Sequence, residues 1–188
     1  MTHPLLNDID RSRTLCFTGH RPEKLPRDPR ALYQCLHYHI GQALAQGYRC
    51  FLDGLADGVD YAAVMSLTAW RRDYPDLTVI GVQPCEDYEE FYLSRGYDAG
   101  HLSRMRANLD RHIILPGSYR KGSTVFLARN RFMADHSSAI IAVCGAGRSG
   151  SDQALRYARK RALLYLRIDS HTVDAETPED WVAERCGL

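Results

Sequence analysis

Residues 14–22 read TLCFTGHRP, an apolar run that ends in a threonine, a glycine, a histidine and an arginine. Five more short apolar runs follow along the chain: RCFLD (49–53), LTVIGVQ (77–83), RHIIL (111–115), SAIIAVC (138–144) and LLYLRI (163–168). Most of them are apolar at successive positions rather than at alternate ones. This pattern is typical of strands that are covered on both faces of a parallel sheet.

Amphipathic stretches separate these runs. Residues 30–46 carry an apolar stripe and Gly47 follows them, which predicts a helix with a glycine stop. The tract 87–110 is long enough for two short helices, with a turn at GYDAGH (96–101). Further helices fit residues 57–73, 87–95, 124–136 and 151–161. Strands that alternate with helices predict an α/β fold, a single Rossmann-like, doubly wound and mainly parallel sheet flanked by helices in three layers.

The chain has 188 residues, of which 45% are hydrophobic and 25% charged, and this composition suits one domain. We expect a flexible N-terminus at residues 1–13 and a single Rossmann-like nucleotide-binding domain at residues 14–188. A small terminal helix is expected at residues 177–186.

Composition excludes several classes of function. A net charge of +1 gives no chain-wide field for nucleic acid or an anionic membrane, so DNA is not expected as a partner and an anion site must be local. Six cysteines without a CxxC pair, and no secretory leader, predict a reduced, cytoplasmic protein. No histidine pair has the spacing of metal ligands, so no metal is expected. The apolar runs are too short to span a membrane.

Ligands of open parallel sheets bind beyond the carboxyl ends of the strands. The loop after the first strand therefore makes its residues candidates for a ligand crevice: Thr18, Gly19, His20 and Arg21. His20 is a candidate acid or base, although a lone loop histidine is more often a hydrogen-bonded structural residue.

The loop after the second strand, DGLADGVD (53–60), is acidic. Asp57 can cap the following helix, and Asp60 can support its first turn. Its carboxylates would repel phosphate, so this loop is assigned to ribose hydroxyls or a base. The candidate binding residues here are Gly54, Ala56, Gly58 and Asp60.

The loop after the fifth strand, CGAGRSGSD (144–152), suits an anion better. Its glycines turn freely, its serines supply hydroxyls, and the helix that starts near Ser151 directs its positive end at the loop. The alternative is a glycine-rich turn with a serine cap. The candidate binding residues here are Gly145, Gly147, Arg148, Ser149, Gly150 and Ser151.

Arg129 falls inside the apolar stripe of the helix predicted at 124–136. A buried guanidinium needs an anionic partner, since an unpaired buried charge is very costly. Asp53 or Asp60 would be a structural partner, and a ligand phosphate would be a functional one. Both alternatives stay open at the level of sequence. Asn130, which follows, is counted with Arg129 among the binding candidates.

Three strings together resemble the YpsA-like proteins of the SLOG superfamily: FTGHRP (17–22), GLADGVDYAA (54–63) and RNRFMADHSSAIIAV (129–143). The resemblance extends over about residues 14–168. The superfamily also includes DprA, whose relatives bind single-stranded DNA, and the LOG enzymes, which hydrolyse the bond between a base and ribose phosphate. The resemblance implies a Rossmann-like nucleotide-binding domain of bacterial type.

The sequence departs from the LOG pattern at two positions. Arg129 falls where LOG enzymes carry the arginine of an Arg-Lys pair, but Asn130 replaces the lysine. The catalytic glutamate of the motif PGGxGTxxE falls at Ala154, and Asp152 lies one turn away as a poor substitute. Without that carboxylate, little stabilises the charge that develops as the glycosidic bond breaks, which argues against LOG-type hydrolysis.

Three functions follow, in order of preference. The first is binding or sensing of a nucleotide or derivative, such as ADP-ribose, NAD or a nucleoside phosphate. The second is a nucleotide N-glycosidic hydrolase, with Asp60 or Asp152 as carboxylate and His20 as acid or base. The third is a DprA-like binder of single-stranded DNA, which the near-neutral charge disfavours. A homo-oligomer is an open alternative, because the aromatic residues between Tyr88 and Tyr97 either pack internally or form a surface.

Overall fold

A six-stranded parallel sheet forms the centre of the computed structural model, which describes residues 6–145 and 147–174. The strand order is β4-β3-β2-β1-β5-β6, and every neighbouring pair is parallel. All six expected strands are present: β1 (Thr14–Gly19), β2 (Cys50–Asp53), β3 (Thr78–Gln83), β4 (Arg111–Ile114), β5 (Ala139–Cys144) and β6 (Leu164–Asp169).

The expected helices are also present: α1 (Pro29–Ala45), α2 (Val59–Trp70), α3 (Tyr88–Ser94), α4 (Ala99–Ala107), α5 (Thr124–Asp135) and α6 (Gly150–Lys160). Short 3-10 turns are η2 (Arg11–Arg13), η3 (Pro22–Lys24) and η4 (Tyr119–Lys121). The tract 87–110 holds two short helices, as expected. The turn expected at residues 96–101 is shorter than predicted, because α4 already begins at Ala99. Asp98 caps this helix by accepting a hydrogen bond from Gly100 N at 2.7 Å.

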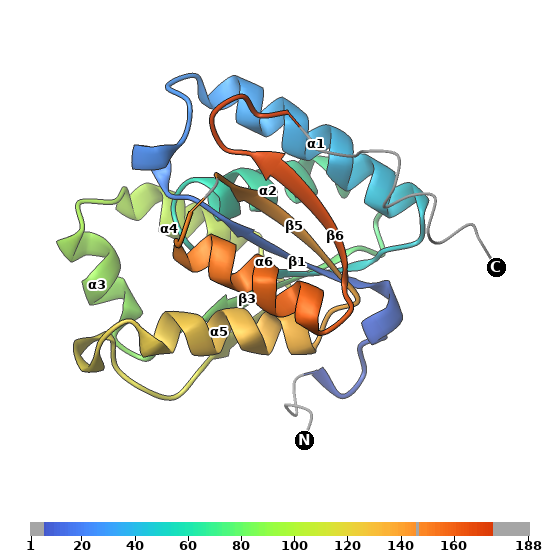
Figure 1. The fold of residues 1–188 in the computed structure, drawn as a ribbon. Coiled ribbons are helices and arrows are strands. Elements are labelled where there is room, and N and C mark those ends of the chain that lie inside the picture. Colours follow the sequence, from blue (N-terminus) through green and yellow to red (C-terminus); the bar gives the residue numbers. More distant parts are fainter. Residues whose placement is uncertain (1–5, 146, 175–188) are drawn as a thin grey trace.

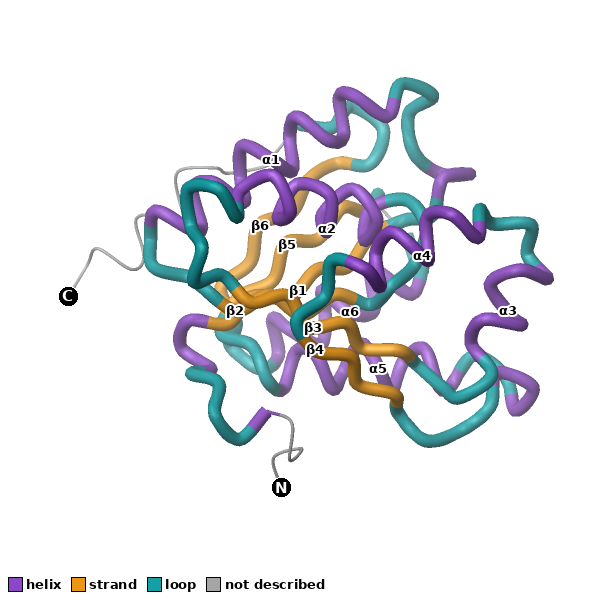
Figure 2. Tube along the Cα trace, turned by 180° about the vertical axis from the view of Figure 1, so that it is seen from behind, coloured by secondary structure: helices purple, strands orange, loops and turns teal. Residues whose placement is uncertain are grey.

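Helices cover both faces of the sheet. Leu15 and Phe17 of β1 pack in the cluster formed with α1 and α2, while Cys16 between them packs in the cluster formed with α5 and α6. In Figure 1, α5 and α6 lie side by side over one face, and Figure 2 shows α1 and α2 next to one another over the other. This two-sided burial is the physical reason for the continuous apolar runs, and it confirms the three-layer α/β fold.

Residues 6–13, within the segment expected to be loose, make ordered contacts. Leu6 is buried, at 2% exposure, in the core beside α5 and α6. Asp8 forms two hydrogen bonds of 2.6 Å with Arg111 of β4, and Arg11 Nε donates to the carbonyl of Asp135 at the end of α5. The short helix expected at 177–186 lies outside the described residues.

The strand order reverses at β1. Strands β2 to β4 lie on one side of β1, and β5 and β6 lie on the other. The carboxyl ends of β1 and β5 are neighbours, with Gly19 in register with Val143. This topological switch point is where open α/β sheets bind ligands. None of the helices in the described part is long and apolar enough to cross a membrane.

Candidate functional site

A crevice of about 380 Å³ opens at the switch point, beyond the carboxyl ends of β1, β5 and β6. We call it the switch-point crevice. Its walls are His20, Glu23, Lys24, Gly145, Gly147, Arg148, Ser149, Asp152, Ser170 and His171. Six of these residues were predicted from the sequence: His20, Gly145, Gly147, Arg148, Ser149 and Asp152.

His20 ties the first loop to the fifth. Its backbone N–H donates to the Val143 carbonyl at 3.1 Å, and its Nε2 accepts from Gly145 N at 3.2 Å. Burial, together with the nearby Lys24, lowers the pKa of this imidazole. A ring whose Nε2 accepts a hydrogen bond is not an imidazolium, which agrees with that direction. His20 is therefore a hydrogen-bonded wall residue of the crevice in this geometry.

Ser149 and Asp152 begin α6 as a reciprocal capping box. Asp152 N donates to Ser149 Oγ at 3.2 Å, and Ser149 N donates to Asp152 Oδ2 at 2.9 Å. Ser149 Oγ also donates to Asp152 Oδ2. Burial raises the pKa of Asp152, but the hydrogen bonds from Ser149 and its other neighbours outweigh burial and hold it below the ordinary value. The helix thus begins at Gly150, one residue before the predicted Ser151, which is buried.

The charged groups of the crevice divide between its rim and its interior. Lys24, Arg148 and His171 are exposed at the rim. Glu23 accepts from the hydroxyl of Tyr97 at 2.9 Å, and the Asp152 carboxylate is held by the cap. Lys24 and Arg148 therefore offer two exposed cations at the rim to an incoming anion.

Sequence reasoning missed the contribution of β6 and the outer end of the first loop. Ser170 is 1% exposed, and its Oγ has no hydrogen-bond partner among the described residues. Ser170 and His171 follow β6 directly, so the rule that loops after parallel strands share one edge would have found them. Glu23 and Lys24 follow β1 in the same way.

The second loop lies apart from the crevice. Asp53 is 0% exposed and its Oδ1 accepts from Leu55 N at 2.8 Å, while Asp60 Oδ2 accepts from Ala56 N at 3.2 Å. Burial raises the pKa of both carboxyl groups, and for Asp53 the neighbouring Asp60 raises it further. Asp53 and Asp60 face the protein interior and Asp57 lines a different cavity, so none of the three carboxyl groups of this loop lines the switch-point crevice.

Arg129 is the cation of this buried group. Its Nη1 donates to the carbonyl of Gly54 and lies 3.9 Å from Asp60 Oδ2, and its Nε donates to Asn130 Oδ1 at 2.8 Å. Of the two alternatives, the structure contains the protein carboxylate as partner. A Cβ on Gly54 would lie 1.8 Å from Arg129 Nη1, so Gly54 is required by the arginine.

The start of α2 corrects the expected cap. Gly58, with φ of +91°, is the N-cap residue, and no side chain caps this helix. Asp57 Oδ1 instead accepts from Gly58 N at 2.9 Å and pairs with His101 Nδ1 at 2.9 Å. A Cβ on Gly58 would meet the His20 carbonyl at 2.8 Å, so the first and second loops touch here.

Two other predicted residues of the first loop also lie elsewhere. The guanidinium carbon of Arg21 stands 5.2, 5.1 and 5.7 Å from the ring centroids of Phe91, Tyr97 and Phe126. Such stacking satisfies a guanidinium without an anion. Gly19 lies against Val59 at the start of α2. The remaining predicted residues Thr18, Ala56 and Gly150 do not line the crevice.

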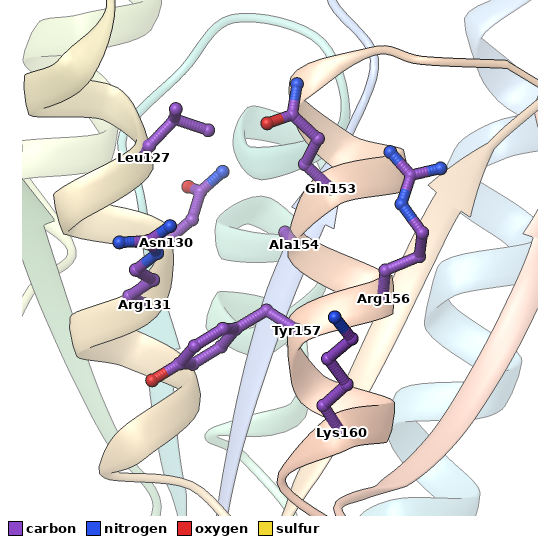
Figure 3. Close-up of a pocket in the computed structure, with 8 residues that line it drawn as sticks. All are labelled: Leu127, Asn130, Arg131, Gln153, Ala154, Arg156, Tyr157 and Lys160. Carbon is purple, nitrogen blue, oxygen red and sulfur yellow. The ribbon is translucent and has the colours of Figure 1, made fainter.

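A smaller pocket of about 210 Å³ separates α5 from α6. Figure 3 shows Leu127, Asn130 and Arg131 on α5 facing Gln153, Ala154, Arg156, Tyr157 and Lys160 on α6. This pocket contains the predicted Asn130 together with Ala154, the position of the LOG glutamate. Its lining includes three cations and no carboxylate.

The fold defines a Rossmann-like α/β protein, and its crevice lies at the switch point of the sheet. A scan against protein-family models gives no match, and a search of curated proteins gives no significant match. Solved structures do match, at identities that establish similarity of fold.

DNA processing protein A from Streptococcus pneumoniae is 16% identical with a TM-score of 0.54, over 92% of this chain and 55% of that one. The chain thus spans about half the length of that protein. DNA processing protein A from Helicobacter pylori, described for its single-stranded DNA binding mode, is 18% identical with a TM-score of 0.56, over 99% and 78%. The molybdenum cofactor carrier protein from Chlamydomonas reinhardtii is 17% identical with a TM-score of 0.52, over 95% and 87%. The chain therefore has a DprA-like Rossmann fold.

Proposed function

We propose that the switch-point crevice binds a nucleotide or a nucleotide derivative, such as ADP-ribose, NAD or a nucleoside phosphate. The observation that carries the proposal is the convergence of Lys24, Arg148 and the start of α6 at the switch point. The crevice volume of about 380 Å³ lies within the range of small-molecule sites, roughly 300–1,000 Å³.

Each part of the ligand has a matching group in the crevice. Lys24 and Arg148 supply cationic donors for phosphate, and the start of α6 lies beside them. Glu23 supplies carboxylate oxygens for ribose hydroxyls, the role first given to the second loop. The Ser170 hydroxyl, which has no partner among the residues described, gives the buried end one more polar contact.

Binding fits this geometry better than hydrolysis. Asp152 accepts from Ser149 in the capping box, and Asp60 lies buried beside Arg129. His20 Nε2 already accepts from Gly145 N. All three candidate catalytic groups thus have structural roles. We therefore extend the proposal from ligand binding to a YpsA-like sensor or carrier of the bacterial cytosol.

The test is titration calorimetry with AMP, ADP, ADP-ribose and NAD, followed by chromatography of any ligand that binds. Arg148→Ala and Lys24→Ala should each weaken binding roughly tenfold, the effect of losing one charge-assisted contact of about 1.4 kcal/mol. Arg72→Ala is the matched control, because the Arg72 side chain is 91% exposed and lies outside the crevice. Unchanged affinity in both crevice variants would remove the proposal, and a cleaved product would favour the hydrolase.

A second candidate is binding of single-stranded DNA along the pocket between α5 and α6. It is favoured by Arg131, Arg156 and Lys160, which line that pocket without a carboxylate. Anisotropy of a labelled oligothymidylate should then fall with salt, and the Arg156→Ala/Lys160→Ala double variant should reduce the salt slope by about 1.4, the effect of losing two phosphate contacts on a single strand. Salt-independent or absent binding would reject this candidate.

A further inference from the structure

A third cavity, larger than the two already described, lies on the face of the sheet covered by α1 and α2. Its volume is about 720 Å³, and its lining shares no residue with the switch-point crevice. Four segments enclose it: the loop 22–27, the first turns of α1, one side of α2 and the start of α4. Figure 2 shows α1, α2 and α4 along this face. This cavity is not part of the proposed nucleotide site.

The walls of this cavity are mainly apolar. Leu25, Leu32, Tyr33, Tyr61 and Met65 contribute side chains, and three prolines stiffen the loop and the start of α1 that form its rim. Leu32 is 4% exposed and belongs to the core, so the floor is continuous with the packed interior. A cavity of this size with apolar walls and a few polar groups has the make-up of a small-molecule site.

One polar pair faces this cavity. His101 Nδ1 lies 2.9 Å from Asp57 Oδ1, and the ring of Tyr61 stacks on the imidazole at 3.9 Å between centroids. Nε2 of the same ring lies 3.6 Å from Asp98 Oδ2, so the imidazole stands between two carboxyl groups. The stacked pair offers a flat face to the cavity, and Asp57 orients the imidazole.

Two arginines stand at the rim. Arg27 and Arg30 are exposed, and neither forms an ion pair within 4 Å among the residues that the structure describes. The one carboxylate in the lining, Asp57, is paired with His101. The site is therefore apolar inside and cationic at its mouth.

We propose that this cavity binds a small organic anion with an aromatic or branched aliphatic body, such as an aryl carboxylate or sulfonate. The body lies against Leu25, Tyr61 and Met65, and the anionic group meets Arg27 and Arg30. The stacked rings of Tyr61 and His101 add a flat face for an aromatic body. This cavity shares no lining residue with the switch-point crevice, so it can bind its ligand independently of the nucleotide site.

The probe is 8-anilinonaphthalene-1-sulfonate, an aromatic anion whose fluorescence rises in apolar surroundings, titrated against the full chain. Near-ultraviolet circular dichroism confirms that each sample is native. The wild type should bind one probe saturably. Met65→Trp fills the cavity and should weaken binding roughly tenfold, while the volume-conserving Met65→Leu should not.

The arginines separate charge recognition from apolar burial, and they keep the test valid if Met65→Trp does not fold. Arg27→Ala/Arg30→Ala should weaken the sulfonate roughly tenfold but leave the neutral analogue N-phenyl-1-naphthylamine unchanged. Arg72→Ala serves as the surface control. Equal losses for both probes, or a Met65→Trp variant that binds the sulfonate as tightly as wild type, would overturn the proposal.

Discussion

Arg129 Nη1 lies 3.9 Å from Asp60 Oδ2, and the two side chains are 9% and 5% exposed. The same guanidinium donates to the carbonyl of Gly54, which follows β2. Arg129 thus joins α5 to the second loop through the interior. An arginine in the apolar stripe of a helix is stabilised here by a partner 69 residues earlier in the chain.

Removal of Arg129 should be costly, because it leaves the buried Asp60 and the carbonyl of Gly54 without their cationic partner. We expect Arg129→Ala to lower the free energy of unfolding by roughly 3–5 kcal/mol in urea titrations. Arg131→Ala, on the exposed side of the same helix, should cost about 1 kcal/mol or less, since Arg131 is exposed and stacks over Tyr157. Similar costs for the two variants would contradict the buried role of Arg129.

The pH dependence of stability should report Asp53. Burial and Asp60 raise its pKa well above the ordinary value of 3.8, so folding favours the protonated form. Its stabilising contribution is complete below pH 3.8 and is lost as the pH rises through the raised pKa of the folded state.

Asp53→Asn keeps an oxygen for the amide of Leu55 but does not ionise. Urea titrations from acidic to alkaline pH should therefore show the wild type losing stability relative to this variant as the pH rises. A constant difference across that range would show that Asp53 does not titrate with a raised pKa.

Substitution of Gly54 by alanine should destabilise the protein. Gly54→Ala would place a Cβ 1.8 Å from Arg129 Nη1, so the ion pair or the loop must move, at about 1–3 kcal/mol in urea titrations. Gly150→Ala is the matched control, since a Cβ there meets nothing within 4 Å and the residue starts α6. If the two variants are equally stable, the second loop is more adaptable than this packing implies.

The capping box and the ligand site can be separated by two variants. Ser149→Ala removes the cap of α6 and should cost about 1 kcal/mol of unfolding free energy. Asp152→Asn retains an acceptor but removes a negative charge beside the proposed phosphate position, so calorimetry should show equal or tighter nucleotide binding. A large loss of affinity in Asp152→Asn would instead mean that its charge contacts the ligand.

Sequence reasoning gave the sheet and its layers because that information is local. Leu15, Cys16 and Phe17 are successive apolar residues, and their burial agrees with a strand that is covered on both faces. The rule that ligands bind beyond the carboxyl ends of parallel strands also predicted that the loop after β5 lines a crevice. Both inferences depend on periodicity and on the direction of the strands.

Contacts between residues that are far apart in the sequence could not be predicted in this way. The sequence shows that Asp57 precedes a helix, but it does not show that the carboxyl group of Asp57 pairs with His101, 44 residues later. Arg21 likewise was assigned to the crevice, because nothing local shows the aromatic rings from α3 and α5 that surround it. The cavity between α1, α2 and α4 was missed for the same reason, since its walls come from four separate segments.

The hydrogen bond from Gly145 N to His20 Nε2 joins residues 125 positions apart. Contacts of such separation form only after a long loop closes, and here β1 and β5 must already lie side by side. The cleft at the switch point is therefore absent from any partly folded chain in which these strands are unpaired. The onset of ligand binding at this cleft during refolding would then report when β1 pairs with β5.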